Sequence, residues 1–438
     1  MKRAHVFFTL VAAGVLITSP RAVSHESACH AGYYRLDDGR GIDVASSGED
    51  SLRWRAPDGT SGALERGTDG RWISTRGWTL RADGVRVSFG DCAAGEIDFA
   101  GTRGHRVAFE TANTRFKSGG VELAGRLVMP PGKGRVPVIV LVHGSEDTSA
   151  IQSYSLQRLF PGEGVGAFVY DKRGTGESAG TYTHNYPELA ADAAAAVGEA
   201  RRLAGARAGR VGFQGSSQGG WVAPRAATLT KVDFVIVGYG LAVSPFDEDN
   251  EAVALDMTRH GFGDAEIRKA LEVASAAQAV ARSNFQSGYE GLDAMRTTYS
   301  QEPWFRHVRG NATGIIYGMS QADLRAQGPV LFHGIIPDYG PMPVLRKLNT
   351  PQLWILGGQD IDAPPAETIR RLRGLQEDGK PISLVVYPLA EHGMYEFETV
   401  ANEERLSTRQ PSTWMPLMVE FARRGKIGPR YEGAQVYR

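Results

Sequence analysis

The chain has 438 residues, of which 22% are charged and 42% hydrophobic, and its 49 basic residues balance 49 acidic ones. At roughly 100–200 residues per domain, this length favours two domains over one small domain. The balanced charge gives no reason to expect a nucleic acid or an anionic membrane surface as partner.

The first residues resemble a secretory signal. Lys2 and Arg3 precede an apolar run, Val6 to Ile17, and small residues follow at 22–24. Because the run is too short to span a bilayer as a stable helix, a cleaved signal peptide over residues 1–24 is favoured over a retained anchor. We therefore expect a secreted or periplasmic protein with no membrane span in the mature chain.

Residues 25–104 predict a small all-β domain. Asp-Gly pairs separate short alternating segments, and they suit tight hairpin turns because glycine tolerates positive φ; they stand at 38–39, 58–59, 69–70 and 83–84. The chain has two cysteines, Cys29 and Cys92, and an oxidising compartment favours a disulfide between them over two free thiols. The tryptophans of this region either form a carbohydrate-binding face or, the favoured interpretation, fill its core: Trp54, Trp72 and Trp78.

From residue 105 to 438 the pattern changes to strands that alternate with helices. Apolar, strand-like runs stand at 136–142, 165–170, 210–214 and 232–237, and an Ala-rich helical segment stands at 187–203. Continuous apolar strands of this kind predict a mostly parallel sheet with helices on both faces. In such sheets the chemistry lies at the carboxyl ends of the strands.

The first of these strands ends at His143-Gly144-Ser145. Backbone N–H groups just past a strand lie at the carboxyl edge of the sheet, and we expect the N–H of Ser145 to be one donor of an oxyanion hole. Glu146 and Asp147 follow directly. A solvated loop is favoured for these two acids over contact with a cationic substrate group.

The segment Gly215-Ser216-Ser217-Gln218-Gly219 lies between a strand-like run and a helix-like one. A direct strand-to-helix turn strains the central residue, and only small neighbours two residues before and two after avoid a clash. This spacing selects Ser217, rather than Ser216, as the candidate nucleophile. The N–H of Gln218, at the helix N-terminus, is the second expected oxyanion donor.

Two further segments follow a long stretch rich in helix formers, at about 241–345. The strand-like run 351–356 opens into a Gly-rich turn that carries Asp360, where a carboxylate can orient a histidine. Asp362, on the same turn, is the competing candidate. The last strand-like run, 382–387, leads to His392 on the following loop, where an imidazole can reach both neighbours.

The order Ser217, Asp360, His392 is that of the α/β-hydrolase superfamily, and the chain resembles this family from about residue 105 to 430. The resemblance rests on motifs at 143–145, 170–178, 215–219, 357–360 and 391–393. Within the superfamily the chain looks most similar to bacterial secreted hydrolases of the esterase and serine aminopeptidase-like branch. Relatives often carry Gly where Glu146 stands here, and their counterpart of 170–178 is structural.

The resemblance implies an α/β-hydrolase fold with a helical cap at about 241–345, and the cap is expected to select the substrate. Its large side chains either line an acyl pocket or, the favoured interpretation, form the core of the cap itself: Trp304, Phe305, Tyr317 and Met319.

These residues predict a serine hydrolase that works through an acyl-enzyme. His392 removes the proton of Ser217 as it attacks a carbonyl, and Asp360 holds the imidazole in the right tautomer. We expect no cofactor and no metal, because neither the cysteines nor the other histidines show ligand spacing.

Three functions compete. The favoured one is hydrolysis of small carboxylic esters, since the acyl-enzyme machinery suffices for it. The alternative is a serine peptidase acting on short peptides, with the acids at 247–251 as an anchor for a charged terminus. The lesser alternative is a non-catalytic binding protein that kept the fold. Nothing in the sequence predicts the oligomeric state.

Overall fold

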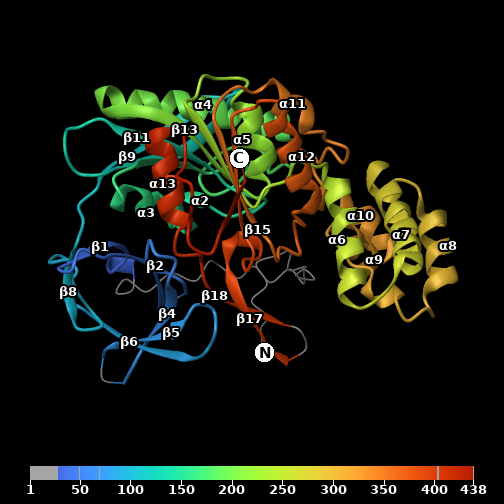
Figure 1. The fold of residues 1–438 in the computed structure, drawn as a ribbon, viewed down its shortest axis with the longest axis horizontal. Helices are drawn as coiled ribbons and strands as arrows, with labels where there is room; N and C mark the ends of the chain where they lie inside the picture. Colours follow the sequence, from blue (N-terminus) through green and yellow to red (C-terminus); the bar gives the residue numbers. More distant parts are fainter. Residues whose placement is uncertain (1–27, 49, 69, 402–403, 438) are drawn as a thin grey trace. The chain divides into compact units, whose positions relative to one another are not determined.

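A computed structural model describes residues 28–48, 50–68, 70–401 and 404–437 (Figure 1). The predicted signal peptide, residues 1–24, lies outside the described residues, as does Asp69 of one predicted turn. The described residues divide into two units: those of 28–108 together with 395–416, and those of 109–394 together with 417–437.

The first unit contains a closed barrel of antiparallel strands, in which each strand pairs with the next and the last returns to the first. The strands are β1 (Gly32–Leu36), β2 (Gly41–Ser46), β3 (Ser51–Arg55), β4 (Ser61–Arg66), β5 (Trp72–Arg76), β6 (Ala82–Phe89), β7 (Glu96–Phe99) and β8 (Thr102–Arg106). The predicted all-β domain is thereby confirmed.

Alternation along the strands builds the barrel core. In β3, Leu52 and Trp54 are buried while Arg53 between them and the two end residues are half-buried, which is the period of two that a strand imposes. Trp54 and Trp72 belong to this core. Trp78 instead contacts Tyr395, with ring centroids 4.5 Å apart, and the Arg53 guanidinium lies 4.1 Å from its ring. Two of the three tryptophans are therefore core residues, as favoured.

Residues 395–416 contribute a hairpin to the barrel unit, β17 (Glu396–Thr399) paired with β18 (Arg405–Arg409). The Trp78 N–H donates to the Ser407 carbonyl at 2.8 Å. The sequence prediction assigned this segment to the hydrolase domain. Its place in the first unit differs from that assignment because the contacts that decide it join residues more than 300 positions apart.

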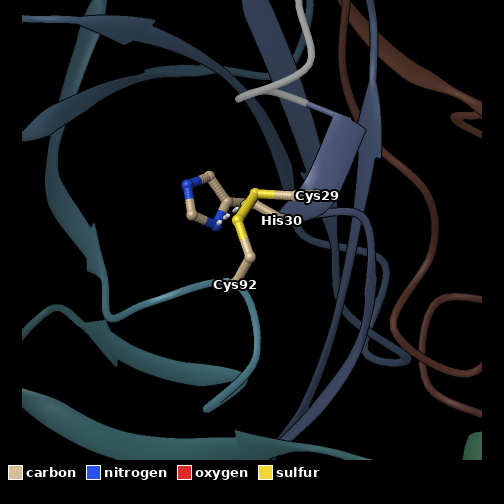
Figure 2. A group of neighbouring side chains, drawn as sticks. All are labelled: Cys29, His30 and Cys92. Carbon is tan, nitrogen blue, oxygen red and sulfur yellow. Dashed lines mark hydrogen bonds between the residues drawn. A yellow bond between two sulfur atoms is a disulfide. The ribbon is translucent and has the colours of Figure 1, made fainter.

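The predicted disulfide joins Cys29 to Cys92, whose Cα atoms lie 5.5 Å apart. Figure 2 shows the bonded sulfur atoms with the His30 ring beside them. That ring stacks on Phe89 at a centroid distance of 4.3 Å. Arg106 donates to the carbonyls of both cysteines, so this corner of the barrel is closed by a covalent bond and by hydrogen bonds.

The second unit is built on a nine-stranded sheet in the order β19-β16-β15-β14-β13-β11-β12-β10-β9. In this order, the strands from β16 to β12, with β11 among them, run parallel to one another. By contrast, β9, β10 and β19 are antiparallel to their neighbours. Their bounds are β9 (Glu110–Ser118), β10 (Val121–Met129), β11 (Val136–Val142), β12 (Gly166–Tyr170), β13 (Ala208–Ser216), β14 (Phe234–Gly238), β15 (Gln352–Gly357), β16 (Ile382–Tyr387) and β19 (Gln435–Tyr437).

Helices cover both faces of this sheet, as predicted. They are α2 (Ala150–Ser153), α3 (Leu156–Gly162), α4 (Tyr186–Ala204), α5 (Gly219–Ala226), α12 (Ala366–Glu377) and α13 (Trp414–Arg424). Buried residues of α4, α5 and α12 share one core with alternate strand residues such as Val235. The preceding residue of β14, Phe234, points the other way and contacts Phe421 of α13.

The predicted helical cap lies between β14 and β15 and contains α6 (Pro245–Arg259), α7 (Asp264–Arg282), α8 (Tyr289–Tyr299), α9 (Ala312–Gly318) and α10 (Gln321–Leu331) (Figure 1). The last helix of this segment, α11 (Met342–Lys347), instead packs into the core of the sheet through Leu345. Trp304, Phe305 and Tyr317 pack into one apolar cluster of the cap, and Met319 packs into another. These four residues are core of the cap, as favoured. No helix among the described residues is both long enough and apolar enough to cross a membrane.

Removal of the disulfide should destabilise the barrel unit. The bridge spans a sequence separation of 63, for which loss of loop-closure entropy corresponds to about 4 kcal/mol of unfolding free energy. We expect the double variant Cys29→Ala/Cys92→Ala to lower the melting temperature of one calorimetric transition, and reductant to do the same to the wild type. Mass spectrometry after alkylation without reductant is the check: two added labels on the wild type would contradict the bridge.

Candidate functional site

Ser217 lies on a strained turn between β13 and α5. Its φ of 51° falls in the left-handed region, which non-glycine residues rarely adopt. A Cβ on Gly215 would clash with the Gly219 carbonyl, and a Cβ on Gly219 would clash with the Val142 carbonyl. The turn is held by the Ser217 N–H, which donates to the Gly238 carbonyl at 3.0 Å. The two glycines are therefore required by close backbone approach, as the motif predicted.

The structure brings together the three residues predicted to act on one another. The Nε2 atom of His392 lies 3.1 Å from Ser217 Oγ, and its Nδ1 atom lies 2.9 Å from Asp360 Oδ2. His392 begins a short 3₁₀ turn, η3 (His392–Met394), just past β16. A hydroxyl within reach of an imidazole whose other nitrogen faces a buried carboxylate can lose its proton to that imidazole.

Asp360 and Asp362 have different positions on the loop after β15. Asp360 is 2% exposed, and its Oδ1 accepts from the backbone N–H groups of Asp362 and Ala363 at 3.0 and 2.8 Å. These two bonds fix the carboxylate so that the other oxygen faces His392. Asp362 contributes its backbone N–H to this arrangement, and its carboxylate is half-buried nearby.

The predicted oxyanion donors lie on either side of Ser217. Gln218 follows Ser217 at the start of α5, and a Cβ on Gly144 would lie 3.3 Å from Ser217 Cβ, so the loop that carries Ser145 runs past the nucleophile. Among the described residues, neither backbone N–H has a hydrogen-bond acceptor. The Gln218 side chain is held 2.7 Å from His184 Nδ1. Both N–H groups can therefore donate to a ligand oxygen.

Charges around His392 favour its protonated form. Burial disfavours the imidazolium, but Asp360, Asp362 and Glu248 outweigh burial and raise the pKa of His392 to about 9. Burial also raises the pKa of Asp362, to about 6, against the opposing effect of His392. Burial likewise raises the pKa of Glu248, well above its usual range.

Two groups of side chains have metal-ligand types within reach of one another in the described part of the chain. One is Cys29, His30 and Cys92, whose sulfur atoms are bonded to each other and so are not free thiolates. The other is Asp360, Asp362 and His392, in which His392 Nδ1 already faces Asp360. We assign neither group to a metal.

Sequence reasoning missed Tyr239 and Lys172 near the site, and it named Glu248 only as one of the acids that could anchor a charged terminus. Glu248, at the start of α6, lies close enough to His392 to affect its pKa, and it accepts from Asn311 at 3.1 Å. Tyr239, with a φ of 43°, contacts the His392 ring at 4.9 Å. Lys172 reaches the Gly144 carbonyl. Only the strained Tyr239 follows a rule visible from sequence, since it directly follows a parallel strand.

A family model described as X-Pro dipeptidyl-peptidase (S15 family) matches residues 119–249, less than half of the chain. The match includes Ser145 and Ser217 but ends before Asp360 and His392. No curated protein matches the sequence.

Solved structures similar to this chain include an esterase from Pyrococcus furiosus, at 15% identity over 65% of this chain and 84% of that one, with a TM-score of 0.40. An acylaminoacyl peptidase from Pyrococcus horikoshii has 16% identity over 91% of this chain, with a TM-score of 0.44; this chain spans 58% of its length. A hypothetical protein from Pseudomonas aeruginosa has 18% identity over 72% of this chain and 93% of its own, with a TM-score of 0.39.

The raised pKa of His392 should govern the reactivity of Ser217. A base must be neutral to accept a proton, so we expect the rate of Ser217 labelling by a fluorophosphonate to rise about tenfold per pH unit up to a midpoint near pH 9. Asp362→Asn removes a negative charge that stabilises the imidazolium, so the midpoint should move to lower pH. The exposed Asp378→Asn is the matched control and should leave it in place. A wild-type midpoint near 6.5 would contradict the assignment.

Proposed function

We propose that the chain is a secreted serine hydrolase of the α/β-hydrolase superfamily that cleaves small carboxylic esters. The proposed superfamily is supported by the mostly parallel sheet, by the helices that cover both of its faces, and by the matched family model. The finer assignment, to esters and to named catalytic residues, is our proposal.

In the proposed mechanism, Ser217 Oγ attacks the ester carbonyl while His392 Nε2 accepts its proton. The tetrahedral oxyanion accepts hydrogen bonds from the N–H groups of Ser145 and Gln218, and His392 then protonates the departing alcohol. Water, deprotonated by His392, attacks the acyl-enzyme and releases the acid. Asp360 holds the imidazole with Nε2 toward Ser217 throughout.

One observation carries this proposal: the continuous contact from Ser217 Oγ through His392 to Asp360, at 3.1 and 2.9 Å. Neither distance needs to change before proton transfer, since both lie within hydrogen-bond range. The strained turn at Ser217 costs stability without contributing to a protein that only binds a ligand. The strain therefore disfavours the non-catalytic alternative.

A peptidase is the second candidate, because the matched family model is described as an X-Pro dipeptidyl-peptidase. Glu248 also supports it, since this acid lies at the start of the cap and close enough to His392 to affect its pKa. Burial raises the pKa of Glu248 itself well above its usual range, and a bound cation would favour its ionised form. An acid in this position can attract the amino terminus of a short peptide. Of the other acids predicted as an anchor, Asp249 is buried and accepts from Thr313 and Gln278, so it serves the cap.

Secretion is part of the proposal and rests on two features. The N-terminal residues have the charge and apolar pattern of a signal peptide. The Cys29–Cys92 disulfide is typical of an oxidising compartment, such as the periplasm or the cell exterior.

Substrate panels should separate the two candidates. We expect p-nitrophenyl acetate and butyrate to be hydrolysed with higher kcat/KM than dipeptidyl and aminoacyl nitroanilides, including those with proline before the scissile bond. Ser217→Ala should lower ester turnover by at least about 10⁴-fold, because no other group replaces the nucleophile. The neighbouring Ser216→Ala is the matched control for the elbow. Preference for the X-Pro anilide would select the peptidase, and intact turnover in Ser217→Ala would reject the nucleophile.

Substitution of Asp360 and substitution of Asp362 should have different effects on turnover. Asp360→Asn should lower kcat by about 10³–10⁴-fold, because the amide favours the wrong histidine tautomer. Asp362→Asn should change kcat by no more than about tenfold at the pH optimum, since its carboxylate acts on the pKa of His392 from a distance. Steady-state kinetics across pH 6–10 measures both. A larger loss in Asp362→Asn would reverse the assignment.

A further inference from the structure

The counterpart of segment 170–178 is structural in relatives. In this chain, the segment places the buried amine of Lys172 against the loop that carries Ser145. Lys172 follows β12 and is 3% exposed. Its Nζ atom donates to the Gly144 carbonyl at 2.6 Å. A buried lysine destabilises the fold unless its charge is paired, so we expect the contact between Lys172 and the Gly144 carbonyl to have a role.

This role concerns the peptide that joins Gly144 to Ser145. This peptide is trans, so its C=O and its N–H point in opposite directions. Lys172 holds the carbonyl on one side, and the Ser145 N–H is thereby directed to the other. We propose that Lys172 is a positioning residue for the oxyanion hole: it fixes this peptide so that the Ser145 N–H faces the substrate oxygen. The inference rests on the proposed function, in which that N–H is a donor.

Neighbouring contacts fix the rest of the loop. The Tyr182 hydroxyl donates to the Ser145 carbonyl, and Lys172 Nζ lies 4.9 Å from the Tyr182 ring. The Gly144 N–H donates to the Tyr154 hydroxyl at 3.4 Å. Three successive peptides of the loop are therefore held by side chains from outside it, and Lys172 holds the one with the predicted donor.

Glu146 explains why a cation suits this position. Its carboxylate stands where relatives often carry Gly, and it lies beside His143 and Gly144, with its side chain 42% exposed. Partial burial raises the pKa of Glu146, but His143, the backbone N–H of Glu146 and, to a smaller extent, Lys172 outweigh it and lower this pKa to about 2. Lys172 therefore also partly offsets the charge of this carboxylate beside the Gly144–Ser145 peptide.

Lys172→Met tests the proposal, because it keeps the length of the side chain and removes the donor. We expect kcat for p-nitrophenyl butyrate to fall about 10²-fold, the effect of losing one oxyanion donor, with KM within about twofold of wild type. Affinity for a trifluoromethyl ketone, which forms an oxyanion adduct with Ser217, should fall by the same factor. Affinity for an ether analogue without a carbonyl should stay unchanged. Rates are normalised to the fluorophosphonate-titrated fraction of sites.

Lys380→Met is the matched control, since this exposed lysine also donates to a neutral oxygen, Asn349 Oδ1 at 3.0 Å, and should behave as wild type. Tyr182→Phe frees the adjacent peptide without changing charge and should lower kcat and ketone affinity together by about tenfold. If Lys172→Met does not fold, the Tyr182→Phe variant provides the test. Unchanged affinity of Tyr182→Phe for the trifluoromethyl ketone then overturns the proposal.

Three results separate the possible failures. A wild type that is active and labelled on Ser217, with ketone affinity unchanged in Lys172→Met, overturns the role of Lys172 alone. An equal loss of ketone and ether affinity also overturns it, because that pattern reflects a collapsed pocket. A wild type that neither turns over substrates nor reacts with the fluorophosphonate overturns the proposed function itself.

Discussion

The left-handed backbone at Ser217 is the constraint on which the rest of the site depends. Such a conformation costs about 1–3 kcal/mol and persists only where its surroundings over-determine it. Here they do, because β13 lies in the middle of the parallel strands, between β11 and β14, and the Ser217 N–H is bonded to Gly238 of β14. The hydroxyl is thus placed by the sheet itself rather than by a flexible loop.

The parallel sheet then brings distant residues to one edge. Ser145, Ser217, Asp360 and His392 follow β11, β13, β15 and β16, and the carboxyl ends of parallel strands lie together. This is why the sequence could predict the fold and could propose residues that the structure places at one edge: each rule needed only a strand and the residues after it. The choice between Asp360 and Asp362 stayed open, because it depends on which carboxylate accepts the N–H groups of the turn.

Other features depend on contacts that no local pattern records. The hairpin β17–β18 was assigned to the wrong unit, since its partners lie in the first hundred residues. Gly84 was predicted to form a hairpin turn, but it lies within β6 with a φ of 81°, and the chain reverses earlier, after Arg76. Lys172 looked structural because its partner, the Gly144 carbonyl, lies on a different loop.

The acids around His392 bear on the choice of substrate. They stabilise the imidazolium that forms in the transition state, but they also keep the free base protonated at neutral pH, and each unit of pKa corresponds to about 1.4 kcal/mol. A neutral ester leaves this balance unchanged. A substrate that brings a positive charge toward Asp362 offsets the effect of that carboxylate and lowers the pKa of His392. For the proposed neutral ester, the fraction of neutral His392 therefore increases with pH up to the pKa of this base, whereas a cationic substrate shifts the same dependence to lower pH.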